Sequence, residues 1–342
     1  MKRVVWIISE GSPGHLSQSE GLVAALSQQI DLELHIVRTS QRFGGFIRHL
    51  IRRWMGHEGS PLSARFLKHW LRCEPPGKPP DLIITSGGKA VFAARSLAVR
   101  YGAPLVFLGE RKPYPAHWFH TVFTPSPFET DTTDVPLEMI PTSITPQNVT
   151  AAAEAWKERP DGHLWAMILG GASASHHYTD EDWQLLAGEM NSLAVTHGIR
   201  WLVSSSRRTG ARAEEILRRF LVSEHVASAV WWAEKPEKRM AAFLGSAAWI
   251  FVTQDSVTMV TEAVASGRPV VVTMPSGVRL KPTGFLRSYF ERLEKLQRIT
   301  RITIATLSDF RPAATDLQPR LLSINSELAS MLLARLDWPA SR

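Results

Sequence analysis

The chain has 342 residues, of which 44% are hydrophobic and 21% are charged, and this composition excludes a disordered or fibrous protein. Its length predicts two domains of about 150 residues each, and its single cysteine excludes an intramolecular disulfide. The net charge of +7 is carried by residues 38–72, which hold eight basic side chains and one acidic side chain, while the rest of the chain is balanced. A protein that binds nucleic acid through general basicity is therefore excluded.

Predicted strands alternate with helical patterns along most of the chain. Short β-branched or aromatic runs bounded by glycine, proline or serine are typical of buried strands, and their alternation with helices predicts an α/β fold with parallel sheets. We expect two doubly wound, Rossmann-like domains that face each other across a cleft, where ligands of such folds bind. In chain order, the predicted strands are residues 3–8, 33–37, 82–85, 105–108, 121–124, 165–169, 201–204, 229–232, 249–252 and 270–273.

A proline-rich stretch separates the two sets of strands. Three prolines between residues 136 and 146 precede an alanine-rich segment, which predicts a linker. We expect domains at residues 1–150 and 151–311, followed by a helical tail at residues 312–342 that can pack on either domain.

The loop after the first predicted strand carries the first candidate site. Residues 9–15 read Ser-Glu-Gly-Ser-Pro-Gly-His, and a helix is expected from about Ser17. Gly14 allows a close backbone approach to a ligand, and the helix N-terminus favours an anion. The segment does not match the dinucleotide fingerprint, and the Ser-Gly-Gly-Lys-Ala run at residues 86–90 does not match the Walker pattern. His15 is either an acid–base residue that faces the cleft or a solvated loop histidine.

Two loops of the second domain carry small and basic residues. Gly170, Gly171 and Ser173 either let main-chain N–H groups and a hydroxyl face the cleft or form an ordinary turn. Arg207 and its neighbour Arg208 either bind a phosphate or carboxylate or form a solvated charge pair.

Two adjacent histidines follow the glycine turn. We expect His176 and His177 on the surface, because adjacent residues point in different directions and no partner four residues away supports a metal site. The chain also has no Asp-x-Asp cluster, and no metal site is expected.

The most informative segment is residues 250–272, where a strand ends at Thr253 and a helix is expected from near Ser256. The free N–H groups in the first turn of such a helix suit a diphosphate. Glu262 either accepts hydrogen bonds from ribose hydroxyls or is an ordinary exposed glutamate, and the scarcity of charges on the rest of this helix favours the first interpretation.

The basic segment contains two amphipathic patterns, at residues 43–55 and 62–71. They are either core-packing helices with cationic outer faces or a patch that binds an anionic membrane surface, and nucleic acid is a weaker third alternative. The chain has no apolar run long enough for a membrane span. The apolar run near its start is too short for a signal peptide. We expect a cytoplasmic protein, peripheral at most on the inner face of the membrane.

These motifs resemble the Elm family, which is named after a plant mitochondrial-fission factor and is common in bacteria, where its members are classed as glycosyltransferases. The resemblance rests on residues 11–18, the Gly170-Gly171 turn, residues 205–209 and, most specifically, residues 253–263. The first, second and last of these motifs are also more distantly similar to those of the peptidoglycan N-acetylglucosaminyltransferase of the GT-B class.

The resemblance implies a metal-independent glycosyltransferase that moves a sugar from a nucleotide-sugar such as a UDP-sugar to a glycolipid or saccharide of the cell envelope. The second domain would bind the diphosphate at Ser256, Val257 and Thr258 and the ribose at Glu262, and the first domain would bind the acceptor. No cofactor beyond the nucleotide-sugar is expected.

Sugar transfer needs a base for the acceptor hydroxyl and stabilisation of the departing diphosphate. His15 is the candidate base, with Glu10 and Glu110 behind it, and Arg207 or Arg208 would stabilise the diphosphate. Two other functions stay open, a nucleotide-sugar epimerase of the same architecture and a non-catalytic adaptor at a membrane surface.

The expected partners are a nucleotide-sugar, the acceptor and an anionic membrane surface at residues 38–72, with no nucleic acid. The candidate catalytic residues are His15 and Glu110. The candidate ligand-binding residues are Gly14, Gly170, Gly171, Ser173, Arg207, Asp255, Ser256, Val257, Thr258 and Glu262.

Overall fold

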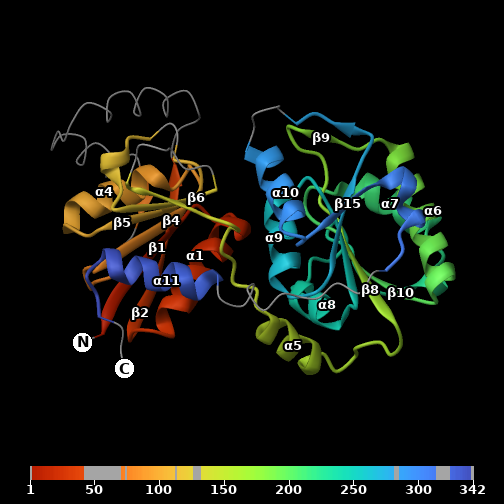
Figure 1. Ribbon diagram of the computed structural model, residues 1–342, viewed down its shortest axis with the longest axis horizontal. Helices are drawn as coiled ribbons and strands as arrows, with labels where there is room; N and C mark the ends of the chain where they lie inside the picture. The colour runs from red at the N-terminus through yellow and green to blue at the C-terminus, as the bar shows by residue number, and fades with distance from the viewer. Residues whose placement is uncertain are drawn as a thin grey trace. The chain divides into compact units, whose positions relative to one another are not determined.

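The computed structural model describes residues 2–41, 71–73, 75–111, 114–125, 132–280, 285–312 and 324–339. The chain divides into two compact units (Figure 1): the first comprises Met1–Ser143 and Ser323–Arg342, and the second comprises Ile144–Leu322. The division thus comes before the expected residue 150, and residues 323–342 of the expected tail belong to the first unit. The amphipathic pattern at residues 43–55, and the one at 62–71 up to residue 70, lie outside the described residues.

The first unit is built on a seven-stranded sheet with the order β3-β2-β1-β4-β5-β6-β7. Neighbouring strands are parallel except β2 and β3, which are antiparallel with Thr39 opposite Cys73. Leu71 and Arg72 were expected at and just after the end of a helix and instead lie in β3, because they pair with the end of β2. The strands are β1 (Arg3–Ser9), β2 (Leu32–Gln41), β3 (Leu71–Cys73), β4 (Leu82–Ser86), β5 (Leu105–Leu108), β6 (Thr121–Thr124) and β7 (Asp134–Pro136).

The described helices of the first unit include α1 (Pro13–Ser27), α4 (Val91–Tyr101) and α11 (Ile324–Arg335). Helix α1 begins four residues before the expected Ser17, because the fixed φ of Pro13 suits a first helical turn. Helix α11 packs against α1 (Figure 1), and Nδ2 of Asn325 donates to the carbonyl oxygen of Thr142 at 3.0 Å. The chain's last described helix therefore belongs structurally to its first domain.

The second unit is built on a six-stranded parallel sheet with the order β11-β10-β8-β12-β13-β15. Numbered within the unit, this is the 3-2-1-4-5-6 order of dinucleotide-binding folds, in which ligands bind where the order reverses. Here that switch point lies at the carboxyl ends of β8 and β12. The strands are β8 (Leu164–Ile168), β10 (Arg200–Ser204), β11 (Val226–Val230), β12 (Trp249–Thr253), β13 (Val270–Met274) and β15 (Thr300–Thr303).

The prediction of two doubly wound, Rossmann-like α/β domains is confirmed by these sheets. The sequence did not predict β3, β7, β15 or the short antiparallel pair β9 (His176–His177) and β14 (Gly277–Val278). The helices of the second unit are α5 (Pro146–Ala155), α6 (Asp180–His197), α7 (Gly210–Phe220), α8 (Met240–Ser246), α9 (Val257–Ala265) and α10 (Phe285–Lys295).

Aromatic side chains fill the core of the second unit. Trp165, Trp201 and Phe251 are fully buried. The ring centroids of Trp165 and Phe251 lie 5.4 Å apart in a stacked arrangement, and those of Trp201 and Phe251 lie 5.2 Å apart edge to face. Such close packing gives the loops at the carboxyl end of the sheet a rigid support.

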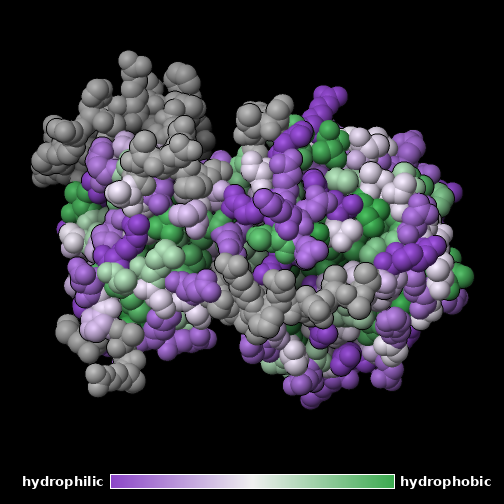
Figure 2. Space-filling model, in the orientation of Figure 1, coloured by the Kyte–Doolittle hydropathy of each residue, from purple (hydrophilic) through white to green (hydrophobic). Residues whose placement is uncertain are grey.

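Hydrophilic side chains cover much of the surface visible in Figure 2, with smaller apolar patches between them. Within the part of the chain that the structure describes, no helix combines the length and the apolar character that crossing a bilayer requires.

Candidate functional site

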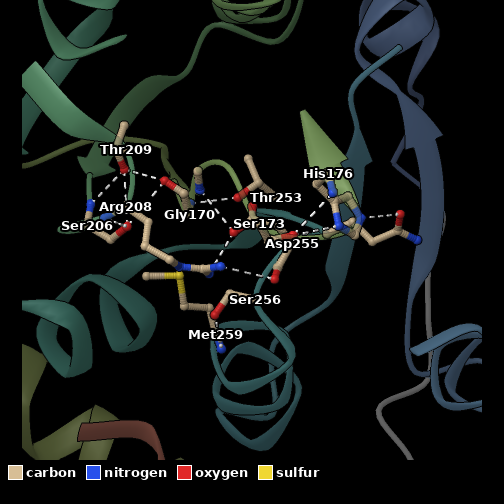
Figure 3. Close-up of polar contacts among 12 residues, drawn as sticks. Gly170, Ser173, His176, Ser206, Arg208, Thr209, Thr253, Asp255, Ser256 and Met259 are labelled. Atoms are coloured by element: carbon tan, nitrogen blue, oxygen red, sulfur yellow. Dashed lines mark hydrogen bonds and ion pairs between the residues drawn. The ribbon is translucent and has the colours of Figure 1, made fainter. Parts of the chain in front are cut away.

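Three loops meet at the switch point of the second unit (Figure 3). They follow β8, β10 and β12, and hydrogen bonds and an ion pair between residues far apart in sequence hold them together. Parallel strands bring their carboxyl ends to one edge of the sheet, which is why these loops are neighbours.

Asp255 is the centre of this arrangement. Its side chain is fully buried, and its carboxylate accepts hydrogen bonds from the Gly171 N–H at 2.9 Å and the Tyr178 hydroxyl at 3.1 Å. It also forms an ion pair with Arg208, with Nη2 and Oδ2 2.6 Å apart. Burial first, and then the adjacent Asp255 charge and hydrogen bond, raise the pKa of Tyr178, so its hydroxyl stays protonated as a donor. The Asp255 carboxylate was predicted to bind a ligand, but it binds groups of the protein itself.

Arg208 presents the positive charge of the site. Its side chain is 37% exposed, and Nη1 also donates to the main-chain oxygen of Asp255 at 3.4 Å, just before α9 begins. Arg207 is exposed and forms no hydrogen bond or ion pair with any described residue. The structure therefore brings Arg208, rather than the predicted Arg207, to the N-terminus of α9.

Gly170 and Gly171 allow the three loops to approach closely. A Cβ on Gly170 would lie 2.1 Å from Oδ2 of Asp255, and one on Gly171 would lie 2.0 Å from the main-chain oxygen of Arg208. The Gly170 N–H donates to Oγ1 of Thr253 at 2.7 Å, and the Gly171 N–H donates to Asp255. Both N–H groups are thus engaged within the protein, and the two glycines shape the site instead of offering these donors to a ligand.

The first turn of α9 carries main-chain donors that are not used. Ser256 is the N-cap, and its Oγ accepts the Met259 N–H at 3.4 Å. The N–H groups of Val257 and Thr258 have no hydrogen-bond partner among the described residues, as expected for the start of a helix. Both residues are partly exposed. The N–H groups of Val257 and Thr258, which are predicted to bind the diphosphate, therefore lie at the same helix terminus as Arg208, which Asp255 holds there.

Glu262 lies on the partly exposed face of α9. It follows Thr258 by four residues, which places both on one side of the helix, while Val260, Thr261 and Ala263 are buried. Glu262, which is predicted to bind the ribose, thus lies on the same face of α9 as Thr258, which is predicted to bind the diphosphate.

His176 is fully buried, so the prediction that it lies on the surface is wrong. Its Nε2 lies 3.1 Å from Oε1 of Gln254, and its Nδ1 lies 3.0 Å from Oγ of Ser175. Oγ of Ser173, a predicted ligand, accepts the N–H groups of Ser175 and His176 at 3.3 Å and 3.2 Å. His177, the next residue, is exposed as expected. The sequence could not reveal a partner that lies 78 positions away.

In the first unit the strand order reverses between β1 and β4, and this switch point brings Glu10 and His15 together. Nδ1 of His15 lies 2.5 Å from Oε1 of Glu10, and the side chains are 39% and 11% exposed, respectively. Burial alone would raise the pKa of Glu10, but the hydrogen bond from His15, a main-chain hydrogen bond and the charges of His15 and Lys89 outweigh burial and lower that pKa. Glu10 is therefore an ionised partner that fixes the imidazole.

Gly87, in the loop after β4, lies directly against this imidazole. It has a φ of +76°, and a Cβ there would come 2.1 Å from Nδ1 of His15. The loop is held from the other side, where the Tyr114 hydroxyl donates to the main-chain oxygen of Gly88 at 2.7 Å. Gly87 thus limits where the His15 ring can lie, and Tyr114 holds the loop that carries Gly87. No pattern in the sequence connects either residue with His15.

The other two predicted residues of the first unit lie apart from this contact. Glu110 is exposed after β5 and forms no hydrogen bond or ion pair with a described residue. Gly14 lies in the first turn of α1. The structure brings Glu10, and not Glu110, to His15. Among the described residues, no three His, Cys, Asp or Glu side chains gather as a metal site.

A model of the family described as Mitochondrial fission ELM1 matches residues 13–336. The chain belongs to this family. The resemblance predicted from the sequence is thereby confirmed. An uncharacterized protein of Rickettsia prowazekii (strain Madrid E) is 25% identical over 147 residues, a match that covers 41% of this chain and 40% of that protein. The chain thus aligns with less than half the length of this curated relative.

Solved structures show the same architecture as this ELM1 family member. The UDP-GlcNAc 2-epimerase of Methanocaldococcus jannaschii, in complex with UDP-GlcNAc and UDP, is similar with a TM-score of 0.55 at 13% identity, covering 98% of this chain and 100% of that one. The calicheamicin glycosyltransferase CalG4 is similar with a TM-score of 0.54 at 15% identity, covering 98% of each chain. Acinetobacter baumannii MurG has a lower TM-score of 0.44 at 13% identity over 97% of this chain and 91% of that chain. The first two similarities show the GT-B-like fold, which glycosyltransferases and epimerases share.

Proposed function

We propose that this ELM1 family member is a glycosyltransferase that moves a sugar from a nucleotide-sugar, such as a UDP-sugar, to an acceptor hydroxyl. The observation that carries the proposal is the position of Arg208, which Asp255 holds at the open N-terminus of α9. A guanidinium matches paired phosphate oxygens, and a helix N-terminus favours an anion. Together they suit the diphosphate that leaves when the sugar is transferred.

The Glu10–His15 pair supplies the base in this proposal. With Nδ1–H of His15 donating to Glu10, Nε2 is left to take the proton of the acceptor hydroxyl. The acceptor oxygen bonds to the anomeric carbon as the bond from that carbon to the phosphate oxygen breaks, and its electron pair stays on the diphosphate. The lowered pKa of Glu10 keeps its carboxylate ionised, which stabilises the imidazolium that forms.

The remaining ligand contacts of the second unit follow from the same arrangement. Val257 and Thr258 would donate their N–H groups to the diphosphate, the Ser256 hydroxyl lies at the same helix terminus, and Glu262 would accept hydrogen bonds from the ribose. Arg208 and the helix terminus would supply the positive charge that such a reaction needs. We therefore expect transfer without an added metal, with full activity retained in excess EDTA.

The proposed acceptor is a glycolipid or saccharide of the cell envelope, bound by the first domain. This part rests on the charge of residues 38–72, which would attract the chain to an anionic membrane surface. Flotation with anionic and neutral vesicles tests it: binding to anionic vesicles alone is expected, and equal behaviour with both would refute it.

The proposed function is tested by thermal shift followed by product analysis. One of the UDP, GDP, TDP or CMP compounds should raise the melting temperature. With the matching nucleotide-sugar, release of the nucleoside diphosphate should require an acceptor. An epimer formed without acceptor would instead identify an epimerase, and no stabilisation by any nucleotide would favour the non-catalytic adaptor.

A further inference from the structure

Trp232 is a feature of the second unit that the proposed function leaves unused. It lies two residues after the end of β11 at Val230, and it is 41% exposed. Its indole ring makes no aromatic or cation–π contact with the described residues. The carboxyl end of β11 is on the edge of the sheet where such folds bind their ligands.

The backbone that carries this exposed ring is held by a buried network. The Trp232 N–H donates to Oγ of Ser205 at 2.7 Å, and the Ala233 N–H donates to Oε1 of Glu214 at 3.1 Å. The Ser205 hydroxyl donates to the same Glu214 oxygen at 2.7 Å, and Glu214 is 3% exposed. Burying a carboxylate is costly unless it is well hydrogen-bonded. Here these hydrogen bonds fix the backbone beneath an exposed tryptophan.

The main-chain donors of this turn are all engaged. The N–H groups of Glu234 and Lys235 donate to the carbonyl oxygen of Trp231, at 3.1 Å and 2.9 Å. With the N–H groups of Trp232 and Ala233 also used, the turn offers a ligand the exposed indole ring of Trp232 and not a row of main-chain donors. A flat, rigid aromatic surface on a fixed backbone suits another flat aromatic group.

Trp232 and Arg208 lie at the carboxyl ends of adjacent strands. β11 pairs with β10, and β10 pairs with β8 at the switch point. Neighbouring strands are about 4.8 Å apart, so the end of β11 is about 10 Å from that of β8. In a nucleoside diphosphate, the ribose and the first phosphate together span a gap of this order between the terminal phosphate and the base.

We propose that Trp232 stacks on the base of the nucleoside diphosphate whose phosphates Arg208 binds. This inference rests on the proposed function and adds to it a site for the nucleobase. Stacking on an aromatic ring tolerates different bases because each base has a π face.

Calorimetric titrations with UDP and with inorganic pyrophosphate, which has no base, test the proposal. Trp232→Ala should weaken UDP binding about five- to hundredfold and leave pyrophosphate binding unchanged. Trp232→Phe, which keeps an aromatic face, should lose less. Phe220→Ala removes another aromatic ring of the second unit, 40% exposed at the end of α7, and should leave both affinities unchanged.

Each contrary result has a distinct meaning. Equal UDP affinity of the wild type and Trp232→Ala would overturn the stacking inference and leave the proposed function standing. Equal losses of UDP and pyrophosphate affinity would also overturn it, because the change would then act through the loops and not through the base. A wild type that binds neither pyrophosphate nor any nucleotide of the thermal-shift screen would refute the proposed function together with this inference.

Discussion

The two switch points of the molecule are built in different ways. At the end of β8 and β12, one buried carboxylate on Asp255 binds a main-chain N–H, a tyrosine hydroxyl and a guanidinium from three segments. At the end of β1 and β4, His15 is held by one carboxylate and by contact with a glycine, and its side chain stays 39% exposed.

This difference matches what each site would have to do. A diphosphate site works by fixed charges and dipoles, which act best when they are preorganised and do not move. An acid–base histidine needs one ring nitrogen held and the other open to the substrate. We therefore expect substitutions in the second unit to reduce stability more, and substitutions in the first unit to act more on His15 itself.

The largest effect is expected for Asp255→Ala. It leaves a tyrosine hydroxyl, a main-chain N–H and the Arg208 guanidinium without their partner. Loss of a buried ion-pair partner lowers the free energy of unfolding by about 3–5 kcal/mol. Because Arg208 is partly exposed, we expect a loss of about 3 kcal/mol here. Urea unfolding measures the change.

Asp180→Ala is the matched control for this prediction. Asp180 pairs with Arg212 at 2.9 Å, but the two side chains are 45% and 65% exposed. Its removal should cost less than about 1 kcal/mol. Equal losses for both aspartates would show that Asp255 is no structural centre.

The next largest effect is expected for Gly171→Ala. Its new Cβ would meet the Arg208 backbone, which cannot turn away as a flexible side chain can, so overpacking should cost about 1–3 kcal/mol. Gly188→Ala lies in α6 with open space around it and should stabilise the protein by about 0.5–1 kcal/mol. The unfolding midpoints of both variants are measured. If both shifted in the same direction, the close packing of the loops would be contradicted.

Gly87→Ala tests the site of the first unit, where fewer contacts hold the functional side chain. The alanine would adopt a positive φ, which costs about 1–2 kcal/mol, and its Cβ would displace the His15 ring. Gly102→Ala pays a similar backbone cost at a φ of +65° with nothing within 4 Å. Both variants should lose similar stability, but only Gly87→Ala should change the NMR signals of the His15 ring and reduce transfer. If the NMR signals of the His15 ring were unchanged in Gly87→Ala, the claim that Gly87 positions His15 would be wrong.

The smallest effect is expected for Glu10→Gln and depends on pH. Because the pKa of Glu10 is lowered in the folded protein from 4.5, its carboxylate stabilises the fold above the unfolded pKa, and this contribution is lost as pH falls through the folded pKa. The stability difference between the wild type and Glu10→Gln should thus shrink as pH falls below about 4.5. Unfolding midpoints across this range would contradict the prediction if the difference grew on acidification.

The buried apolar strands and the start of α9 could be predicted from local patterns, whereas α1 begins four residues earlier than expected. Runs such as residues 105–108 are apolar throughout and are bounded by turn residues, so periodicity and punctuation suffice. Helix α9 begins directly after Ser256, as its capping residue predicts. The two-residue strands β9 and β14 have no such signal, because their pairing joins segments about 100 positions apart.

The site was predicted less completely because neighbours in space are not neighbours in sequence. The motif around Arg207 and Arg208 indicated a cation, but only the contact with Asp255 shows which arginine is fixed. Asp255 itself was assigned to the ligand because a polar residue in a motif shows its chemistry and not its burial. Glu110 and Glu10 both follow strands of the first sheet, and the geometry of α1 decides between them.

The most direct test of the account is the binding of UDP, followed by calorimetry, to Arg208→Ala and Arg207→Ala. The two arginines are adjacent and both exposed, and they differ in the contact of Arg208 with Asp255. Loss of a charge-assisted contact predicts affinity about ten- to hundredfold weaker for Arg208→Ala and nearly unchanged for Arg207→Ala, with Arg208→Lys in between. Unchanged affinity in Arg208→Ala, or a larger loss in Arg207→Ala, would contradict the claim that Asp255 holds Arg208 for the diphosphate.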